Sequence, residues 1–315
     1  MLLINILLLI VGMVLLIKGA DFFVEGSSNV AKALKIPTLI IGLTLVSIGT
    51  SAPELSVSLT SAIQQNDEMS VGNVIGSNIF NVFVVIGASA LMTPLVVSKD
   101  VSRKDIPILL GIYILLALFA FVFGQLVISL VEGIIIFSLF FIYTIYLILR
   151  AKKEPIEEDF KSIEKKTKWW LNLIFIVGGI AGIILGGKIV VDSAEYIAEE
   201  FGMSDRLISL TIVAIGTSLP ELVTSIVAAK KGENDIAVGN AIGSSIFNIV
   251  LILGLSSIIY PLGLTWNEIV DLVVMFVAVL LIFIFSFKNY KINKWQGCLF
   301  ILMYIGYLTF IIIRN

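Results

Sequence analysis

Histidine is absent from this 315-residue chain, and cysteine occurs once, at Cys298. Without histidine the chain lacks the commonest general base, the usual neutral-pH switch and imidazole as a metal ligand. A single cysteine excludes an intramolecular disulfide, and its hydrophobic surroundings predict a buried, inert thiol. These absences remove several common catalytic groups, and the chain is not expected to be an enzyme.

Charge is also scarce, since only 14% of the residues are charged, whereas 58% are hydrophobic and the mean hydropathy is +1.07. Such a composition excludes an ordinary soluble domain. It predicts an all-α membrane protein, because a spanning helix needs roughly 20 apolar residues. Ten such spans are predicted, at about 2–25, 38–63, 71–95, 105–125, 128–150, 170–195, 206–229, 236–262, 267–287 and 296–313.

The basic residues indicate how these spans are oriented. If the N-terminus is outside, most of the 21 lysines and arginines fall in loops that face the cytoplasm. The positive-inside rule therefore predicts that both termini are outside and that the charged linker 151–168 is cytoplasmic. Lys18, Asp21 and Glu25, near the end of the first span, are interpreted as snorkelling or helix-surface pairs.

An internal repeat appears when the sequence is shifted by 167 residues. "GTSAPELSVS" (49–58) then aligns with "GTSLPELVTS" (216–225) at seven of ten positions, and "VGNVIGSNIFN" (71–81) aligns with "VGNAIGSSIFN" (238–248) at nine of eleven. Residues 1–150 and 169–315 thus form two five-span repeats, with alpha-repeats at about 38–95 and 206–262. Five is odd, so the second repeat is inverted, which is typical of secondary transporters.

Each repeat carries a glutamate beside a proline within a hydrophobic span. Pro53 and Pro220 interrupt helical hydrogen bonding, and Glu54 and Glu221 bring carboxylates to the same places. A proline kink with a locally satisfied glutamate is disfavoured, because both features are duplicated. Carboxylates, hydroxyls and freed carbonyls form an all-oxygen environment that suits calcium, magnesium or sodium. The two carboxylates balance one calcium ion.

The second motif places Ser77 one helical turn from Asn81, and Ser244 one turn from Asn248. These side chains supply neutral oxygens for a cation. They also suit interhelical hydrogen bonding, since the neighbouring glycines permit close helix packing. Both interpretations stay open.

At these two motifs the chain resembles the prokaryotic sodium/calcium exchangers of the cation/calcium exchanger superfamily. The resemblance extends over the whole chain. It implies a calcium site at Thr50, Glu54, Thr217 and Glu221, and sodium sites that add Ser51, Ser77, Ser218 and Ser244, with backbone carbonyls near Ser47 and Ala214. Family members often have an aspartate at the central positions, where this chain has Asn81 and Asn248; this difference argues against potassium dependence.

The resemblance further implies electrogenic exchange of three inward sodium ions for one outward calcium ion by alternating access. It implies a plasma-membrane location, function as a monomer, and no cofactor or nucleic-acid partner. The nearest alternative is a proton/calcium exchanger of the same fold, which is expected to lack the Thr-Ser-x-Pro run. A cation channel is disfavoured because channel filters are commonly rings of symmetric subunits. An intramembrane protease is disfavoured because it would need paired aspartates or a Ser-His arrangement, whereas this chain has no histidine and its paired intramembrane acids are glutamates.

Overall fold

The computed structural model is mainly helical and describes residues 1–123, 126–153, 169–202 and 214–314. The first repeat is built, in chain order, from α1 (Leu2–Leu34), α2 (Thr38–Ile41), η1 (Gly42–Val46), α3 (Ser47–Thr50), α4 (Ala52–Ile63), α5 (Asp67–Phe80), η2 (Asn81–Ile86), α6 (Gly87–Met92), η3 (Val101–Asp105), α7 (Ile106–Leu118), η4 (Phe119–Phe123) and α8 (Leu130–Lys153), where η denotes π-helix.

The second repeat follows the same order. Its elements are α9 (Trp169–Glu200), α11 (Ala214–Thr217), α12 (Leu219–Lys230), α13 (Asn234–Phe247), η7 (Asn248–Leu253), α14 (Gly254–Ile259), α15 (Trp266–Asn289) and α16 (Lys294–Arg314). Eight helices in the described ranges are long and apolar enough to span a membrane, and one further span is the bent pair Thr38–Thr50 and Ala52–Ile63. These nine match predicted spans. The span predicted at 206–229 lies partly outside the described residues, as do 154–168 of the predicted linker.

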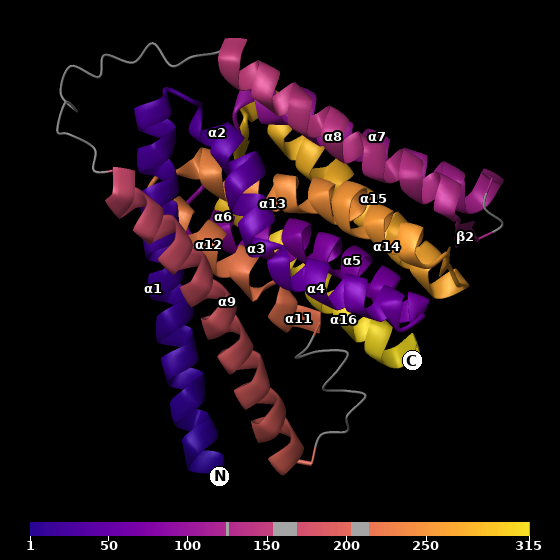
Figure 1. The fold of residues 1–315 in the computed structure, drawn as a ribbon, viewed down its shortest axis with the longest axis horizontal. Coiled ribbons are helices and arrows are strands. Elements are labelled where there is room, and N and C mark those ends of the chain that lie inside the picture. Colours follow the sequence, from indigo (N-terminus) through magenta and orange to yellow (C-terminus); the bar gives the residue numbers. More distant parts are fainter. Residues whose placement is uncertain (124–125, 154–168, 203–213, 315) are drawn as a thin grey trace.

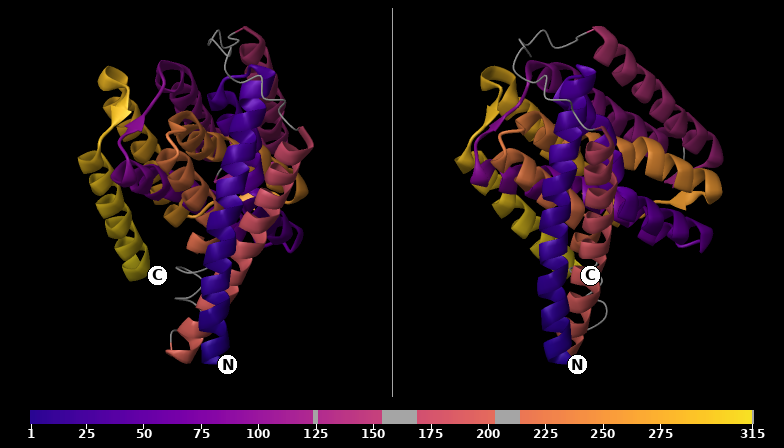
Figure 2. Two further views of the ribbon diagram at one scale, coloured as in Figure 1. Left: turned by 90° about the vertical axis from the view of Figure 1, so that its left-hand side faces the viewer. Right: turned by 60° about the vertical axis from the view of Figure 1, so that its left-hand side comes forward.

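The helices divide into a long pair and a central group (Figure 1). α1 and α9 run side by side, and in all views the N-terminal half of α1 and the C-terminal half of α9 extend beyond the other helices (Figure 2). The spans α5–η2–α6 and α13–η7–α14 are the most deeply buried. Both "GNxIGSxIFN" segments therefore lie in the interior of the helix group.

Glycines allow the backbones of α1 and α9 to approach each other closely. A methyl group on Gly19 would lie 2.7 Å from the amide nitrogen of Ile183, and one on Gly179 would lie 2.7 Å from the amide nitrogen of Phe23. Backbone approach this close is possible only without a side chain, as in other membrane helix pairs with small residues at the interface. The two repeats are thus joined along their first helices.

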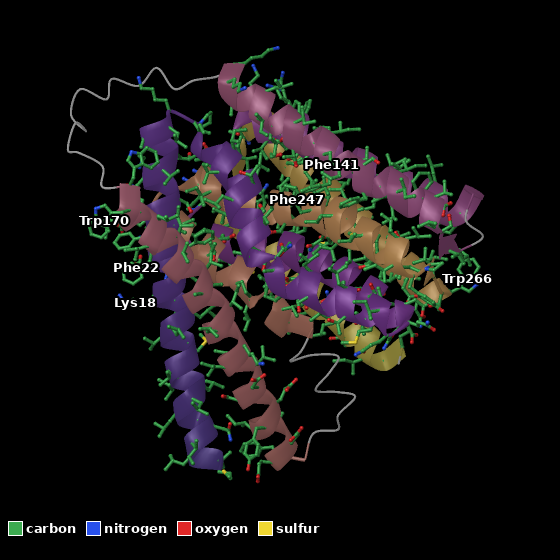
Figure 3. The ribbon with its side chains drawn as sticks, in the orientation of Figure 1. Lys18, Phe22, Phe141, Trp170, Phe247 and Trp266 are labelled. Carbon is green, nitrogen blue, oxygen red and sulfur yellow. The ribbon has the colours of Figure 1, made fainter. Side chains whose placement is uncertain are left out.

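α1 continues nine residues past its predicted end at residue 25, to Leu34. The extra turns are stabilised by the loop that follows α12. Lys231 pairs with Asp21 at 2.7 Å, and Glu233 accepts hydrogen bonds from Lys32 at 3.0 Å and Ser28 at 2.6 Å. Asp21 therefore pairs with a lysine of the other repeat, whereas Lys18 is exposed and points away from the helix pair (Figure 3).

Two short antiparallel ladders, which the all-α prediction did not include, repeat with the internal symmetry. β1 (Leu95–Val96) pairs with β4 (Lys291–Ile292), and β3 (Leu262–Gly263) pairs with β2 (Val127–Ile128). Each ladder joins the turn after the third span of one repeat to the last turn of the other. Two Asp–Arg pairs are placed alike: Arg150 at the end of α8 binds Asp105, and Arg314 at the end of α16 binds Asp271.

The prediction that Cys298 is buried is wrong. Its side chain is exposed on α16, next to the exposed Leu299. A hydrophobic stretch in a membrane helix places apolar side chains on the outer as well as the inner face, so hydropathy alone does not predict burial.

The α1–α9 contact predicts opposite outcomes for two neighbouring glycines. Gly179→Ala should lower the stability by about 1 to 3 kcal/mol, because the new methyl group meets backbone atoms of α1. Gly178→Ala should leave stability unchanged or raise it by up to about 1 kcal/mol, because no atom lies within 4 Å and alanine favours helix. Thermal unfolding of both variants in detergent measures the difference, and equal melting temperatures would contradict this packing.

Candidate ion-binding site

Each "GTSxPE" motif interrupts a helix at its serine. Ser51 has φ −80° and ψ 11°, Ser218 has φ −92° and ψ 5°, and a new helix begins at the next residue in both repeats. The first break bends the span by 50°. Proline follows as the second residue of the new helix, where it needs no hydrogen-bond partner. The predicted helix breaks at Pro53 and Pro220 are therefore confirmed. The first turn of each new helix contains a glutamate.

The two carboxylates are held by serines of the opposite repeat. Ser51 Oγ donates to Glu221 Oε1 at 2.8 Å, and Ser218 Oγ donates to Glu54 Oε1 at 3.0 Å. Both glutamate side chains have no solvent exposure. The second oxygen of each, Oε2, makes no hydrogen bond within the described structure. The site thus presents one buried, unsatisfied carboxylate oxygen from each repeat.

Two asparagines that the sequence analysis did not select hold the broken helices in place. Asn73 Nδ2 donates to the Glu54 carbonyl at 3.2 Å and to Ser58 Oγ at 2.8 Å. Asn240 makes the same two bonds, to the Glu221 carbonyl at 3.2 Å and to Ser225 Oγ at 2.9 Å. The sequence feature that could have identified them is that both stand at the same position in the duplicated segment "VGNxIGS".

The threonines of the predicted calcium site meet these asparagines across the repeat boundary. Thr50 Oγ1 lies 3.0 Å from Asn240 Oδ1, and Thr217 Oγ1 lies 3.5 Å from Asn73 Oδ1. Each asparagine therefore bonds to a glutamate backbone in its own repeat through Nδ2 and to a threonine in the other through Oδ1. The four predicted calcium ligands thus fall into two equivalent hydrogen-bonded groups, Thr50 with Glu221 and Thr217 with Glu54, and each group contains residues of both repeats.

The predicted sodium ligands are divided between the same two groups. Ser77 Oγ lies 3.1 Å from Ser218 Oγ, and Ser244 Oγ donates to Glu221 Oε1 at 3.3 Å and to the Ser47 carbonyl at 3.4 Å. The Ser47 hydroxyl itself donates to the Gly42 carbonyl at 2.6 Å. Ala214 is the first residue of α11, and only its backbone is described.

The central asparagines are fully buried but differ in their partners. Asn248 Nδ2 donates to Asn78 Oδ1 at 3.1 Å, and Asn78 Nδ2 donates to the Ser245 carbonyl at 3.2 Å. Asn248 Oδ1 and both polar atoms of Asn81 have no hydrogen-bond partner among the described residues. Asn248 thus supplies interhelical bonding, while free oxygens for an ion remain on both side chains. A π-helix begins at each of the two residues, a feature found frequently at functional sites.

The ligand atoms that these residues offer to a cation are oxygens. Within the described ranges, no group of three or more Cys, Asp or Glu side chains is placed to hold a metal. A cation here would be coordinated by two carboxylates together with hydroxyl, amide and carbonyl oxygens. Calcium and sodium accept such mixed oxygen shells, whereas zinc and copper prefer sulfur or imidazole.

The crossed serine–glutamate bonds predict a specific pattern of energetic coupling. Ser51→Ala should lower the free energy of unfolding by about 1.5 to 3 kcal/mol without calcium, because the buried Glu221 carboxylate loses the closer of its two hydroxyl donors. In a Glu221→Gln background the same substitution should cost well under half as much, whereas in a Glu54→Gln background it should cost the full amount.

Ser89→Ala is the matched control, since Ser89 is buried without a hydrogen-bond partner in the described structure. It should change stability by less than about 0.5 kcal/mol. Thermal or denaturant unfolding of the purified variants provides the measurement. Coupling of Ser51 to Glu54 instead of Glu221 would refute the crossed arrangement.

Sequence comparisons match this chain to known exchangers and antiporters. The sequence profile described as "Sodium/calcium exchanger protein" matches residues 4–149 and 171–313. The chain is 39% identical over 308 residues to the "Putative antiporter CaxA" of Alkalimonas amylolytica, with 95% of each chain covered. It is 34% identical to the "Sodium/calcium exchanger MaX1" of Methanosarcina acetivorans, covering 98% of this chain and 99% of that protein.

Solved structures agree with these sequence matches. The sodium-calcium exchanger NCX_Mj soaked with zero Na⁺ and Ca²⁺ superposes with a TM-score of 0.87 at 32% identity, covering 99% of this chain and 100% of that one. The same protein soaked with 10 mM Na⁺ and zero Ca²⁺ gives a TM-score of 0.85 at 34% identity, with 98% and 99% covered. Profile, relatives and structures together show that this chain belongs to the sodium/calcium exchanger family.

Proposed function

We propose that this protein is a secondary active antiporter that moves sodium inward and calcium outward by alternating access. The observation that carries the proposal is the pair of buried glutamates, each held by a serine of the other repeat and each with one oxygen left without a partner. A buried carboxylate costs free energy unless a cation or a set of donors compensates its charge. A cation between the repeats supplies this compensation.

Charge balance supports competition between calcium and sodium. Glu54 and Glu221 together carry −2, which one calcium ion neutralises, whereas three sodium ions leave +1. Both ions compete for the same oxygens, so only one kind is bound at a time. With three sodium ions per calcium, each cycle moves one net positive charge in the direction of sodium.

The energy available from such a cycle is sufficient for steep calcium gradients. A tenfold sodium gradient supplies about 1.4 kcal/mol per ion, or about 4 kcal/mol for three. One net charge moving through 100 mV adds about 2.3 kcal/mol. The sum sustains a calcium ratio above about ten-thousandfold.

The proposal includes the orientation of the spans in the membrane. Ten spans in two inverted five-span repeats, with both termini outside, place the two motifs near the bilayer midplane as opposed copies. Contacts between broken helices of opposite repeats, such as Ser51 with Glu221, suit a site that is reached alternately from the two sides. The protein is expected to work as a monomer in the plasma membrane, without a cofactor. A proton/calcium exchanger of the same fold is the nearest alternative.

Calcium uptake into proteoliposomes tests the function directly. Vesicles loaded with sodium and diluted into sodium-free buffer should accumulate ⁴⁵Ca²⁺, and Glu54→Gln should reduce the rate at least about a hundredfold, since about 3 kcal/mol of binding or more is lost. Glu68→Gln, an identical change at an exposed position, should keep the wild-type rate. Uptake that follows a proton gradient without sodium would assign the protein to the alternative.

Stoichiometry is tested by the dependence of the final calcium ratio on membrane potential. In sodium-loaded vesicles, calcium entry with three sodium ions leaving exports one positive charge, so an inside-positive potential should favour uptake. A potassium gradient of tenfold with valinomycin sets about 59 mV, and it should shift the final calcium ratio about tenfold. A ratio that is independent of the potential would indicate two sodium ions per calcium.

A further inference from the structure

A group of exposed cations surrounds the turn between α15 and α16. It consists of Lys99, Arg103, Lys288, Lys291 and Lys294, here called the basic turn. Among the described residues, none of the five forms an ion pair with a carboxylate. The nearby Asp100 is bound by Lys104 and Arg150 instead. The basic turn therefore carries five positive charges without internal compensation.

The fold brings these charges together and holds them next to apolar side chains. The β1–β4 ladder pairs Val96 with Lys291, and the Val97 amide donates to the Tyr290 carbonyl at 2.9 Å. Arg103 lies 5.9 Å from the ring centres of both Phe287 and Tyr290. Aromatic faces hold a guanidinium by cation–π attraction, so this charge is oriented by its neighbours.

The surroundings of the basic turn suit the edge of a bilayer. Trp295 is 61% exposed, Val96 52% and Phe287 47%. A turn between two spanning helices lies at the membrane surface, because hydrocarbon does not accept open backbone. Exposed tryptophan and other apolar side chains at that level contact lipid just below the headgroups.

The pseudo-equivalent turn between α7 and α8 provides a comparison within the chain. The β2–β3 ladder has the same register as β1–β4, and Glu132 caps the start of α8 as Gln296 caps α16. By this alignment Lys291 and Lys294 correspond to Val127 and Leu130. Lys99 and Arg103 correspond in the same way to Trp266 and Val270. The fold therefore forms with uncharged residues at these places, so the packing does not require the cations.

We propose that the basic turn is a binding site for the headgroup of an anionic phospholipid. The phosphodiester and any further acidic group would lie among the five cations, and the acyl chains would lie against Val96, Phe287 and Trp295. A lipid is favoured over a soluble anion because the cations are bordered by exposed apolar side chains at the membrane edge. Basic clusters beside a spanning helix attract anionic lipids by about 1 kcal/mol per charge.

Trp295 allows this site to be observed locally. Replacing the other three tryptophans, by Trp169→Phe, Trp170→Phe and Trp266→Phe, leaves it as the only tryptophan in the chain. This protein is reconstituted in phosphatidylcholine that contains increasing fractions of brominated phosphatidylglycerol or, separately, brominated phosphatidylcholine. Bromine quenches tryptophan fluorescence on contact, so the two series measure which lipid occupies the site. The anionic lipid should be preferred at least about fivefold at low salt, and less at high salt.

Two charge-removing variants distinguish a defined site from general attraction. Combined Lys288→Gln, Lys291→Gln and Lys294→Gln should reduce the preference to less than about twofold. Combined Lys152→Gln and Lys153→Gln, which removes exposed cations at the end of α8, should leave it unchanged. Melting temperatures show whether each variant is folded. Equal quenching by the two lipids in the parent protein, or equal loss in both variants, would overturn the proposal.

Discussion

The structure depends on two crossed hydrogen bonds, from Ser51 to Glu221 and from Ser218 to Glu54. An ionisable side chain in the middle of a membrane costs at least about 2.5 to 3.5 kcal/mol, so a fold keeps one only where other groups compensate it. Here each repeat supplies the hydroxyl that the carboxylate of the other repeat requires. The shortest hydrogen bond to each carboxylate comes from the other half, so the two halves need each other at the site as well as along α1 and α9.

The surrounding scaffold can be understood as support for these bonds. Asn73 and Asn240 hold the backbone at Glu54 and Glu221 and meet a threonine of the other repeat. Close approach of the central helices is possible because Gly42 and Gly239 leave room: a methyl group on either would lie within 3.1 Å of backbone atoms. Helix breaks, buried amides and glycine contacts thus bring hydroxyl, amide and carboxylate oxygens of both repeats close together, and such oxygens can replace the water shell of a hard cation.

Much of this arrangement could be predicted from residues 49–54 and 216–221, because a proline, a glycine and a carboxylate in an apolar span have few explanations. The repeat predicted that the two motifs would converge, but it did not predict that each serine would bond to the glutamate of the other repeat. Asn73 and Asn240 could not be separated from helix-packing residues by type and spacing alone. The extension of α1 to Leu34 is held by Glu233, which is distant in sequence and bonds to Ser28 and Lys32, and the exposure of Cys298 depends on which helix face meets the protein.

The central claim is that Glu54 and Glu221 belong to one calcium site. Equilibrium dialysis of the purified protein with ⁴⁵Ca²⁺, in the absence of sodium, tests it most directly when wild type is compared with Glu54→Gln and Glu221→Gln. A shared site should bind one calcium ion per wild-type chain and lose that ion in either single variant. Two ions bound to the wild type, with one retained in each variant, would contradict it.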